Sequence, residues 1–112
     1  MEKDIIQYDD FAKLDIALGE ILTVEIVEDA DKLLKLTVDV GEENPRQIIS
    51  GIREYFEDPA SLVGAKCPFI VNLQPRVIRG LESQGMILAS EQDGVFAIFK
   101  PHNDLPAGTR LS

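Results

Sequence analysis

The chain of 112 residues is 45% hydrophobic and 28% charged, which fits one folded globular domain with a single core and excludes disordered and fibrous classes. Its 20 acidic and 11 basic residues give a net charge of −9, and such a charge alone argues against long-range attraction of a polyanion. Because the longest apolar runs, such as Phe69 to Val71 and Met86 to Ala89, are too short to span a membrane and the charged N-terminus is no secretory signal, we expect a cytoplasmic protein.

The N-terminal quarter of the chain predicts a short helix and a long strand. One or two helical turns, capped at Asp9 or Asp10, are favoured by the stretch QYDDFAKLDIA, with Phe11 and Leu14 on an apolar face. A strand is predicted by IALGEILTVEIVED, which is rich in β-forming residues and in which Gly19 marks a bulge or bend. The Asp-rich stretch EDADK predicts the turn that follows.

Two further strands and a helix are predicted in the middle of the chain. Apolar and polar residues alternate in LLKLTVDVG, the pattern of a strand with one buried face. After a turn at Asn44-Pro45 we expect a strand from about Arg46 to Ile52 that pairs with the strand before it. Asp58-Pro59 has the form of a helix cap followed by a first-turn proline, so we expect a short helix that ends at Gly64.

The rest of the chain predicts strands at PFIVNL, GMILASE and VFAIFK, with a turn at Asp93-Gly94, and then a Pro- and Gly-rich tail. Five or six strands with one helix after the third follow the order of the OB-fold, a five-stranded Greek-key barrel. We therefore predict an all-β domain over residues 1–112, with a short N-terminal helix, a helix between strands 3 and 4, and a C-terminal extension. The ligand surface of that fold includes the loops between strands 1 and 2 and between strands 4 and 5, here EDADK and the segment 71–90.

The segment 71–90, VNLQPRVIRGLESQGMILAS, differs in charge from the rest of the chain. Residues 1–31 hold ten acids and two bases, whereas residues 66–90 hold three bases and one acid. Because salt screens each patch beyond about 8 Å, a local basic loop can attract an anion despite the acidic total. We therefore expect this loop to bind a ligand.

No combination of residues indicates catalysis, a cofactor or a metal. His102 has no evident partner, and the single Cys67 cannot form an intramolecular disulfide, so we expect an inert, buried or half-buried thiol. The stretch GLESQG is not followed by the Gly-Lys-Ser/Thr of a phosphate loop, and ISGI is not a nucleophile elbow. We expect a non-catalytic module.

Five motifs carry a family resemblance, namely DFAKLDIALGEI, DADKLLKLTVDVG, PRQIISGI, VNLQPRVIRGLESQGMILAS and PAGTR. Over about residues 9–110 the chain resembles the tRNA-binding domain found at the C-terminus of bacterial methionyl-tRNA synthetases, as free-standing dimeric proteins and in the endothelial monocyte-activating polypeptide family. The resemblance implies a homodimer that binds tRNA by its shape and assists methionyl-tRNA synthetase in cis or in trans. It places RNA contacts at eight residues: Lys32, Arg46, Asn72, Arg76, Arg79, Ser83, Gln84 and Met86.

These residue types suit RNA, because Arg and Lys neutralise phosphates while Asn and Gln bond base edges or ribose hydroxyls. The resemblance also implies a dimer interface at the N-terminal helix, the first strand and the C-terminal segment, with Phe11, Leu14, Ile16, Leu105 and Leu111. Val77 departs from the family pattern, in which Lys is frequent at that position, and the flanking segments are acidic. We therefore expect weaker and more salt-sensitive RNA binding than in basic relatives.

Simpler roles for the eight residues stay open. Arg76, Arg79 and Lys32 can be solvated charges, Ser83 and Gln84 can form turns, and Met86 can belong to the core. Two other functions also stay open, a chaperone-like peptide-binding dimer of the same family and a pure dimerisation module. The sequence does not distinguish a free-standing protein from a synthetase domain, nor does it name a preferred tRNA.

Overall fold

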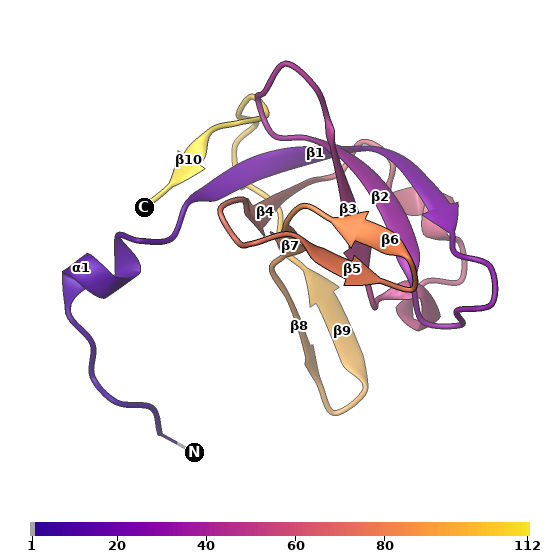
Figure 1. The fold of residues 1–112 in the computed structure, drawn as a ribbon, viewed down its shortest axis with the longest axis horizontal. Helices are drawn as coiled ribbons and strands as arrows, with labels where there is room; N and C mark the ends of the chain where they lie inside the picture. The colour runs from indigo at the N-terminus through magenta and orange to yellow at the C-terminus, as the bar shows by residue number, and fades with distance from the viewer. Residues whose placement is uncertain (1) are drawn as a thin grey trace.

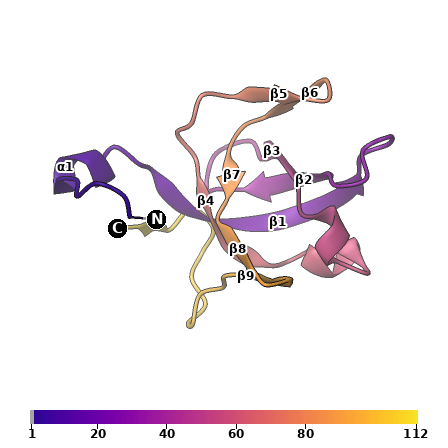
Figure 2. The same ribbon diagram turned by 90° about the horizontal axis from the view of Figure 1, so that it is seen from below.

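The computed structural model describes residues 2–112, in which an antiparallel sheet curves into a nearly closed barrel (Figures 1 and 2). Its strands are β1 (Ile16–Ile26), β2 (Leu34–Asp39), β3 (Arg46–Ser50), β4 (Lys66–Ile70) and β7 (Met86–Ile87). They pair in the order β3-β2-β1-β4-β7, and the Gln84 N–H just before β7 returns to β3 by donating to the Gln47 carbonyl at 2.8 Å. This order confirms the predicted OB-like architecture.

The core lies inside the barrel and follows the predicted alternation. Leu34, Leu36 and Val38 of β2 are fully buried, while the residues between them are only partly covered. A Cβ atom on Gly19 would lie 2.7 Å from the Phe69 ring and from Val38, so glycine is required for the Phe69 side chain to fill the core. The bulge of β1 lies past Gly19, between Ile21 and Thr23, so of the predicted bulge or bend at Gly19 the bulge is wrong in position.

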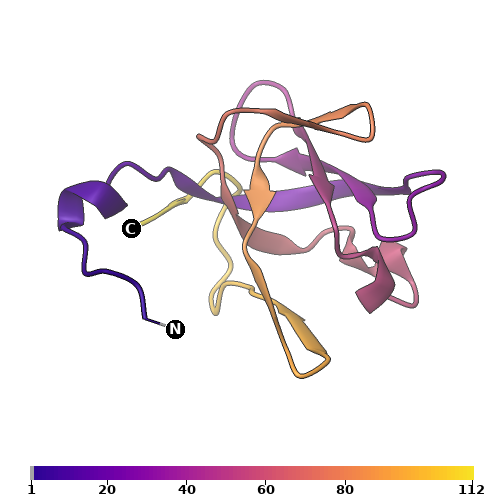
Figure 3. The same cartoon turned by 60° about the horizontal axis from the view of Figure 1, so that its bottom comes forward.

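The N-terminal helix α1 (Tyr8–Phe11) is a single turn that projects from the barrel with the residues before it (Figures 1 and 3). Its N-cap is Gln7, whose N–H donates to the Asp10 carboxylate at 3.1 Å. The predicted cap at Asp9 or Asp10 is therefore wrong, because both residues lie within the helix, where Asp10 bonds back to its start.

The helix predicted between strands 3 and 4 is absent, and two 3-10 turns, η1 (Arg53–Tyr55) and η2 (Pro59–Leu62), stand in its place. Asp58 caps η2 as predicted, with its carboxylate accepting from the Ala60 N–H at 3.2 Å. The turn ends after one round because the Gly64 N–H bonds the Ile21 carbonyl of β1 at 2.8 Å. This contact returns the chain to the sheet before an α-helix can form.

The strand predicted at GMILASE is divided into β7 and β8 (Ala89–Gln92). Between them the Leu88 N–H still donates to the Pro68 carbonyl of β4, and the chain then leaves the barrel. β8 pairs with β9 (Val95–Ile98) across the predicted turn at Asp93-Gly94, and this hairpin projects from the barrel (Figure 3). Phe96 of β9 stacks on Tyr55 with ring centroids 4.4 Å apart, which holds the hairpin against η1.

The C-terminal extension ends in β10 (Arg110–Leu111), which pairs with the first residues of β1 (Figure 1). Helix α1 and strand β10 therefore lie at the same end of β1. Cys67 is buried, and desolvation raises the pKa of its thiol, as expected for an inert side chain. In the stretch from residue 2 to residue 112, no helix has the length and apolar character to cross a membrane.

Candidate nucleic-acid interface

The chain between β4 and β7 forms a small hairpin of β5 (Arg76–Ile78) and β6 (Leu81–Ser83) at one end of the barrel (Figure 2). Arg79 (φ 53°) and Gly80 (φ 80°) form its two-residue turn, in which both residues need a positive φ. The left-handed conformation costs a non-glycine residue about 1 kcal/mol, and at Arg79 it presents an exposed guanidinium at the hairpin tip. Arginine is therefore unfavourable in the left-handed conformation of this surface turn, and such local strain is typical of functional sites.

Three cations lie on this hairpin or beside it. Lys32 of the β1–β2 turn and Arg79 line one hollow together with Ile78 and the acidic Asp29 and Asp31, so the two predicted ligand loops meet. Arg76 lies on β5, exposed, and is paired in register with Ser83 of β6. Within the described residues, none of the three cations forms an ion pair with a carboxylate. They are free to meet an anion.

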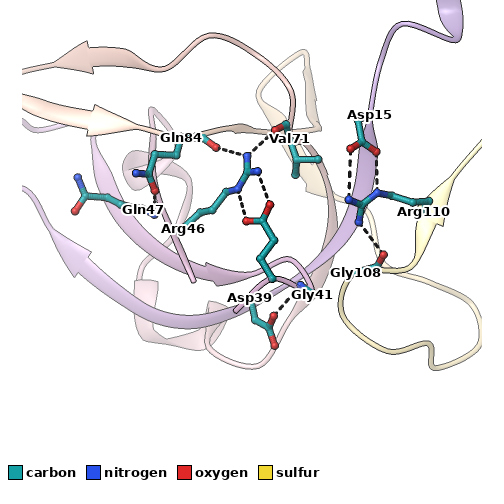
Figure 4. A network of polar contacts seen from close by, with 10 residues as sticks. Asp15, Asp39, Gly41, Arg46, Gln47, Val71, Gln84, Gly108 and Arg110 are labelled. Atoms are coloured by element: carbon teal, nitrogen blue, oxygen red, sulfur yellow. Dashed lines mark hydrogen bonds and ion pairs between the residues drawn. The ribbon is translucent and has the colours of Figure 1, made fainter. Parts of the chain in front are cut away.

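Arg46, by contrast, is held from three sides (Figure 4). Its Nε and Nη2 each donate to one carboxylate oxygen of Glu42 at 2.7 Å, while Nη1 donates to the carbonyls of Val71 at 2.6 Å and Gln84 at 2.9 Å. The Arg46 hydrogen bond holds the pKa of Glu42 below its usual range, and the same bond raises the pKa of Arg46. One guanidinium thus joins the β2–β3 turn, the end of β4 and the segment before β7.

Ser83 and Gln84 close the seam between β3 and the segment before β7. Ser83 is 6% exposed, and its hydroxyl accepts from the Ile49 N–H at 3.0 Å and donates to the Gly85 carbonyl at 3.1 Å. The Gln84 carboxamide accepts from the Gln47 N–H at 3.0 Å (Figure 4) and donates to the Glu82 carboxylate at 3.1 Å. These side chains complete backbone pairing that regular strands would otherwise supply.

Asn72 and Met86 differ in their surroundings. The Asn72 amide donates to the Lys13 carbonyl at 2.7 Å and its oxygen accepts from the Asp15 N–H at 2.8 Å, so it holds the segment between α1 and β1. Met86 pairs with Ile70 in register but leaves 42% of its surface exposed. Its thioether is available to an apolar ligand group.

The eight predicted RNA residues therefore fall into two groups. Lys32, Arg76, Arg79 and Met86 present exposed side chains, of which Lys32 and Arg79 lie together. The others are hydrogen-bonded within the chain; these are Arg46, Asn72, Ser83 and Gln84. Arg46 and Gln84 line a second hollow with Glu42, Asn44, Leu73 and Glu82, while Asn72 is bonded to the segment before β1.

The five residues predicted at the dimer interface form what we call the terminal surface: Phe11, Leu14, Ile16, Leu105 and Leu111. Phe11, Leu14, Leu105 and Leu111 are each between 38% and 44% exposed, whereas Ile16 is half-buried. Leu105 and Leu111 line an apolar hollow of about 210 Å³ together with Leu18, Pro68 and Phe99. Arg110 Nε, 2.8 Å from the Asp15 carboxylate, fixes β10 beside this hollow (Figure 4).

Two residues that hold the predicted site residues in place, Glu42 and Gln47, were not identified by sequence reasoning. Glu42 and Arg46 are four residues apart, but they lie in a turn and a strand, where that spacing has no regular meaning. The only available signal was that Gln47 sits beside Arg46 at the start of a predicted strand. Between residues 2 and 112, no three His, Cys, Asp or Glu side chains lie together as metal ligands.

Comparison with known proteins finds matches that cover nearly the whole chain. The family model described as "Putative tRNA binding domain" matches residues 16–110. A methionine–tRNA ligase of Deinococcus radiodurans is 50% identical over 108 residues, which are 96% of this chain and 16% of that enzyme. The chain thus spans about one sixth of the length of the curated relatives it matches.

Two solved structures share the fold. The crystal structure of a MetRS related protein from Pyrococcus horikoshii is 32% identical with a TM-score of 0.89, covering 98% of this chain and 100% of that one. The chaperone CsaA of Bacillus anthracis is 25% identical with a TM-score of 0.85, covering 97% of this chain and 100% of that one.

Proposed function

Because the chain belongs to the tRNA-binding domain family, we propose that it binds tRNA at the surface formed by the β1–β2 turn and the β5–β6 hairpin. The ligand is recognised by its folded shape, through contacts to backbone phosphates and exposed bases. The chain contributes affinity and no catalysis of its own. Its place of action is the cytoplasm, where tRNA is charged.

The observation that carries this proposal is the group of exposed cations at Lys32, Arg76 and Arg79. They lie on the two loops that bind ligands in OB-folds, and none has a carboxylate partner within the described residues, although the chain as a whole is acidic. Met86 adds an exposed thioether that can lie against a base. The four hydrogen-bonded residues, Arg46, Asn72, Ser83 and Gln84, shape the backbone beneath the RNA.

The active form in this proposal is a homodimer joined through the terminal surface. Support comes from its large exposed apolar side chains, to which the projecting N-terminal segment adds Ile5, Ile6 and Tyr8. Monomeric proteins rarely leave such side chains in one region without cover. A two-fold dimer would present two RNA surfaces to one tRNA, so two weak sites would act together.

The functional context we propose is assistance to methionyl-tRNA synthetase, in cis as a terminal domain or in trans as a separate protein. Support comes from the 50% identity to one sixth of a methionine–tRNA ligase. Tighter retention of tRNA would lower the concentration that the synthetase needs.

A salt-dependent tRNA titration by mobility shift tests the proposal. Binding is expected at low salt, with log K falling linearly against log salt by about 0.7 to 0.9 per phosphate contact. The double variant Arg76→Ala/Arg79→Ala should bind about tenfold more weakly and with a shallower slope, whereas Lys13→Ala, which removes a cation on the N-terminal segment, should bind as the wild type does. Absence of wild-type binding at low salt would end the proposal.

A second candidate function is a chaperone-like dimer that binds peptides. It is favoured by the likeness to CsaA and by the apolar hollow around Phe99 and Leu105. Suppression of the aggregation of a denatured client, without tRNA binding, would support this function over the first.

The third function left open, a pure dimerisation module, predicts a different pattern. Variants of Arg76 and Arg79 would then be silent, and only changes in the terminal surface would affect function. The same variants separate this function from tRNA binding, and the aggregation assay separates the chaperone-like function from both.

A further inference from the structure

Arg46 occupies an unusual position relative to the hairpin that carries Arg76 and Arg79. Its Nη1 atom bonds the Val71 carbonyl, just before the hairpin segment, and the Gln84 carbonyl, just after it (Figure 4). One nitrogen thus bridges both ends of the segment 72–83. The Nε and Nη2 atoms of Arg46 form a bidentate pair with the Glu42 carboxylate. A phosphate would have to displace this carboxylate to bind the same two atoms.

We propose that Glu42, although acidic, supports tRNA binding as a positioning residue, because it orients Arg46 so that Arg46 fixes the ends of the hairpin. This inference rests on the proposed function. When an amide replaces the carboxylate, one of the two acceptor oxygens becomes an NH2 donor, so the guanidinium loses one of its four hydrogen bonds together with the bidentate pair that fixes its plane, and the two carbonyl contacts weaken with it. The hairpin cations then lose their fixed placement.

The turn that carries Glu42 is itself held rigidly. The Gly41 N–H donates to the Asp39 carboxylate at 2.8 Å. A Cβ atom on Gly41 would lie 2.7 Å from the Gly108 Cα, so the turn packs directly on the C-terminal segment (Figure 4). The backbone next to Glu42 is therefore held in place, which a residue that orients another side chain requires.

A simple charge argument predicts the opposite effect. Removing a carboxylate near an RNA surface lowers repulsion and should strengthen binding. Glu43 is the matched control, because it is exposed in the same turn and no hydrogen bond or ion pair involves its side chain within residues 2–112. Glu42→Gln and Glu43→Gln change the net charge equally, so only positioning separates them.

The test is a tRNA titration of wild type, Glu42→Gln, Glu43→Gln and Arg46→Lys at several salt concentrations, with urea unfolding to show that each variant is folded. We expect Glu42→Gln to bind about fivefold more weakly with an unchanged salt slope, and Glu43→Gln to bind as tightly as wild type or more tightly. Arg46→Lys keeps the charge but not the bidentate geometry, so it should bind at least as weakly as Glu42→Gln. Equal binding by Glu42→Gln and Glu43→Gln, or wild-type binding by Arg46→Lys, would overturn the inference.

Amide hydrogen exchange on the same proteins separates the two possible failures. The backbone N–H of Gln84, which donates to the Gln47 carbonyl, should exchange faster in Glu42→Gln than in Glu43→Gln. If wild type does not bind tRNA, the proposed function fails, and this inference fails with it. If wild type binds while Glu42→Gln alters neither affinity nor Gln84 exchange, only the inference fails.

Discussion

The end of the barrel formed by the β5–β6 hairpin and the seam at Ser83 and Gln84, which we call the barrel mouth, differs from the terminal surface in how it treats residues that are unexpected for their place. At the mouth, polar residues from apolar stretches of the sequence, such as the buried Ser83 and the exposed Asn72, form hydrogen bonds inside the chain. At the terminal surface, apolar residues such as Phe11 and Leu111 remain 38% and 43% exposed. A polar residue in an apolar stretch of sequence therefore need not contact the ligand, whereas the exposed apolar residues are those that the proposed dimer would cover.

The largest effect is expected from breaking the terminal surface. Phe11→Glu combined with Leu111→Glu should raise the dissociation constant of the proposed dimer about 100-fold or more, because each side chain is worth about 1.5–3 kcal/mol when fully buried and the new charges repel. Analytical ultracentrifugation over a range of concentrations measures this change.

Val63→Glu is the control for that experiment. Val63 is a similarly exposed apolar residue next to Gly64, which bonds the middle of β1 rather than its start. It should leave the dimer intact. A wild-type chain that is monomeric at all concentrations would remove the terminal surface from the comparison.

Ser83→Ala should be the most damaging single change at the mouth. It leaves the Ile49 N–H buried and unsatisfied, at a cost of about 1–3 kcal/mol in the free energy of unfolding, measured with urea. The exposed Ser90→Ala should stay within about 0.5 kcal/mol of wild type. Unchanged stability with weaker tRNA binding would instead make the Ser83 hydroxyl a direct contact.

Arg79→Gly separates contact from stability in the other direction. Glycine relieves the positive φ of Arg79, so stability should be unchanged or higher by up to about 1 kcal/mol. Loss of the guanidinium should weaken tRNA binding about fivefold and reduce the salt slope by about 0.7 to 0.9. A full-strength complex with an unchanged slope would place Arg79 outside the interface.

The fold was predictable where local pattern and tertiary structure agree. The alternation of β2 and the Asp93-Gly94 turn are local signals, and both were confirmed. The helix predicted after Asp58 failed because the bond from Gly64 to Ile21 joins residues far apart in sequence, which a cap signal cannot anticipate. The β5–β6 hairpin was missed because its turn uses arginine where glycine or asparagine is expected.

The candidate site residues could be chosen from sequence motifs, but their structural roles could not, and their contact with RNA stays a prediction. Arg46 and Arg79 both lie in motifs that carry the family resemblance. Arg46 is hydrogen-bonded to Glu42, Val71 and Gln84, whereas Arg79 is exposed. The difference depends on carbonyl groups brought close by barrel closure. A single sequence does not encode those distances in any local pattern.

The smallest expected effect is the pH dependence of the Glu42 contact. Because the pKa of Glu42 is lowered in the folded chain, its contribution to stability is complete above its ordinary value of 4.5 and is lost as the pH falls through the folded-state pKa. The difference in unfolding free energy between wild type and Glu42→Gln should therefore shrink from pH 7 toward pH 3. With 41% of the Glu42 side chain exposed, that difference should stay below about 1 kcal/mol. Urea unfolding across this range measures it, with Glu43→Gln as the reference; a gap that widens on acidification would show that Glu42 does not act through its ionised carboxylate.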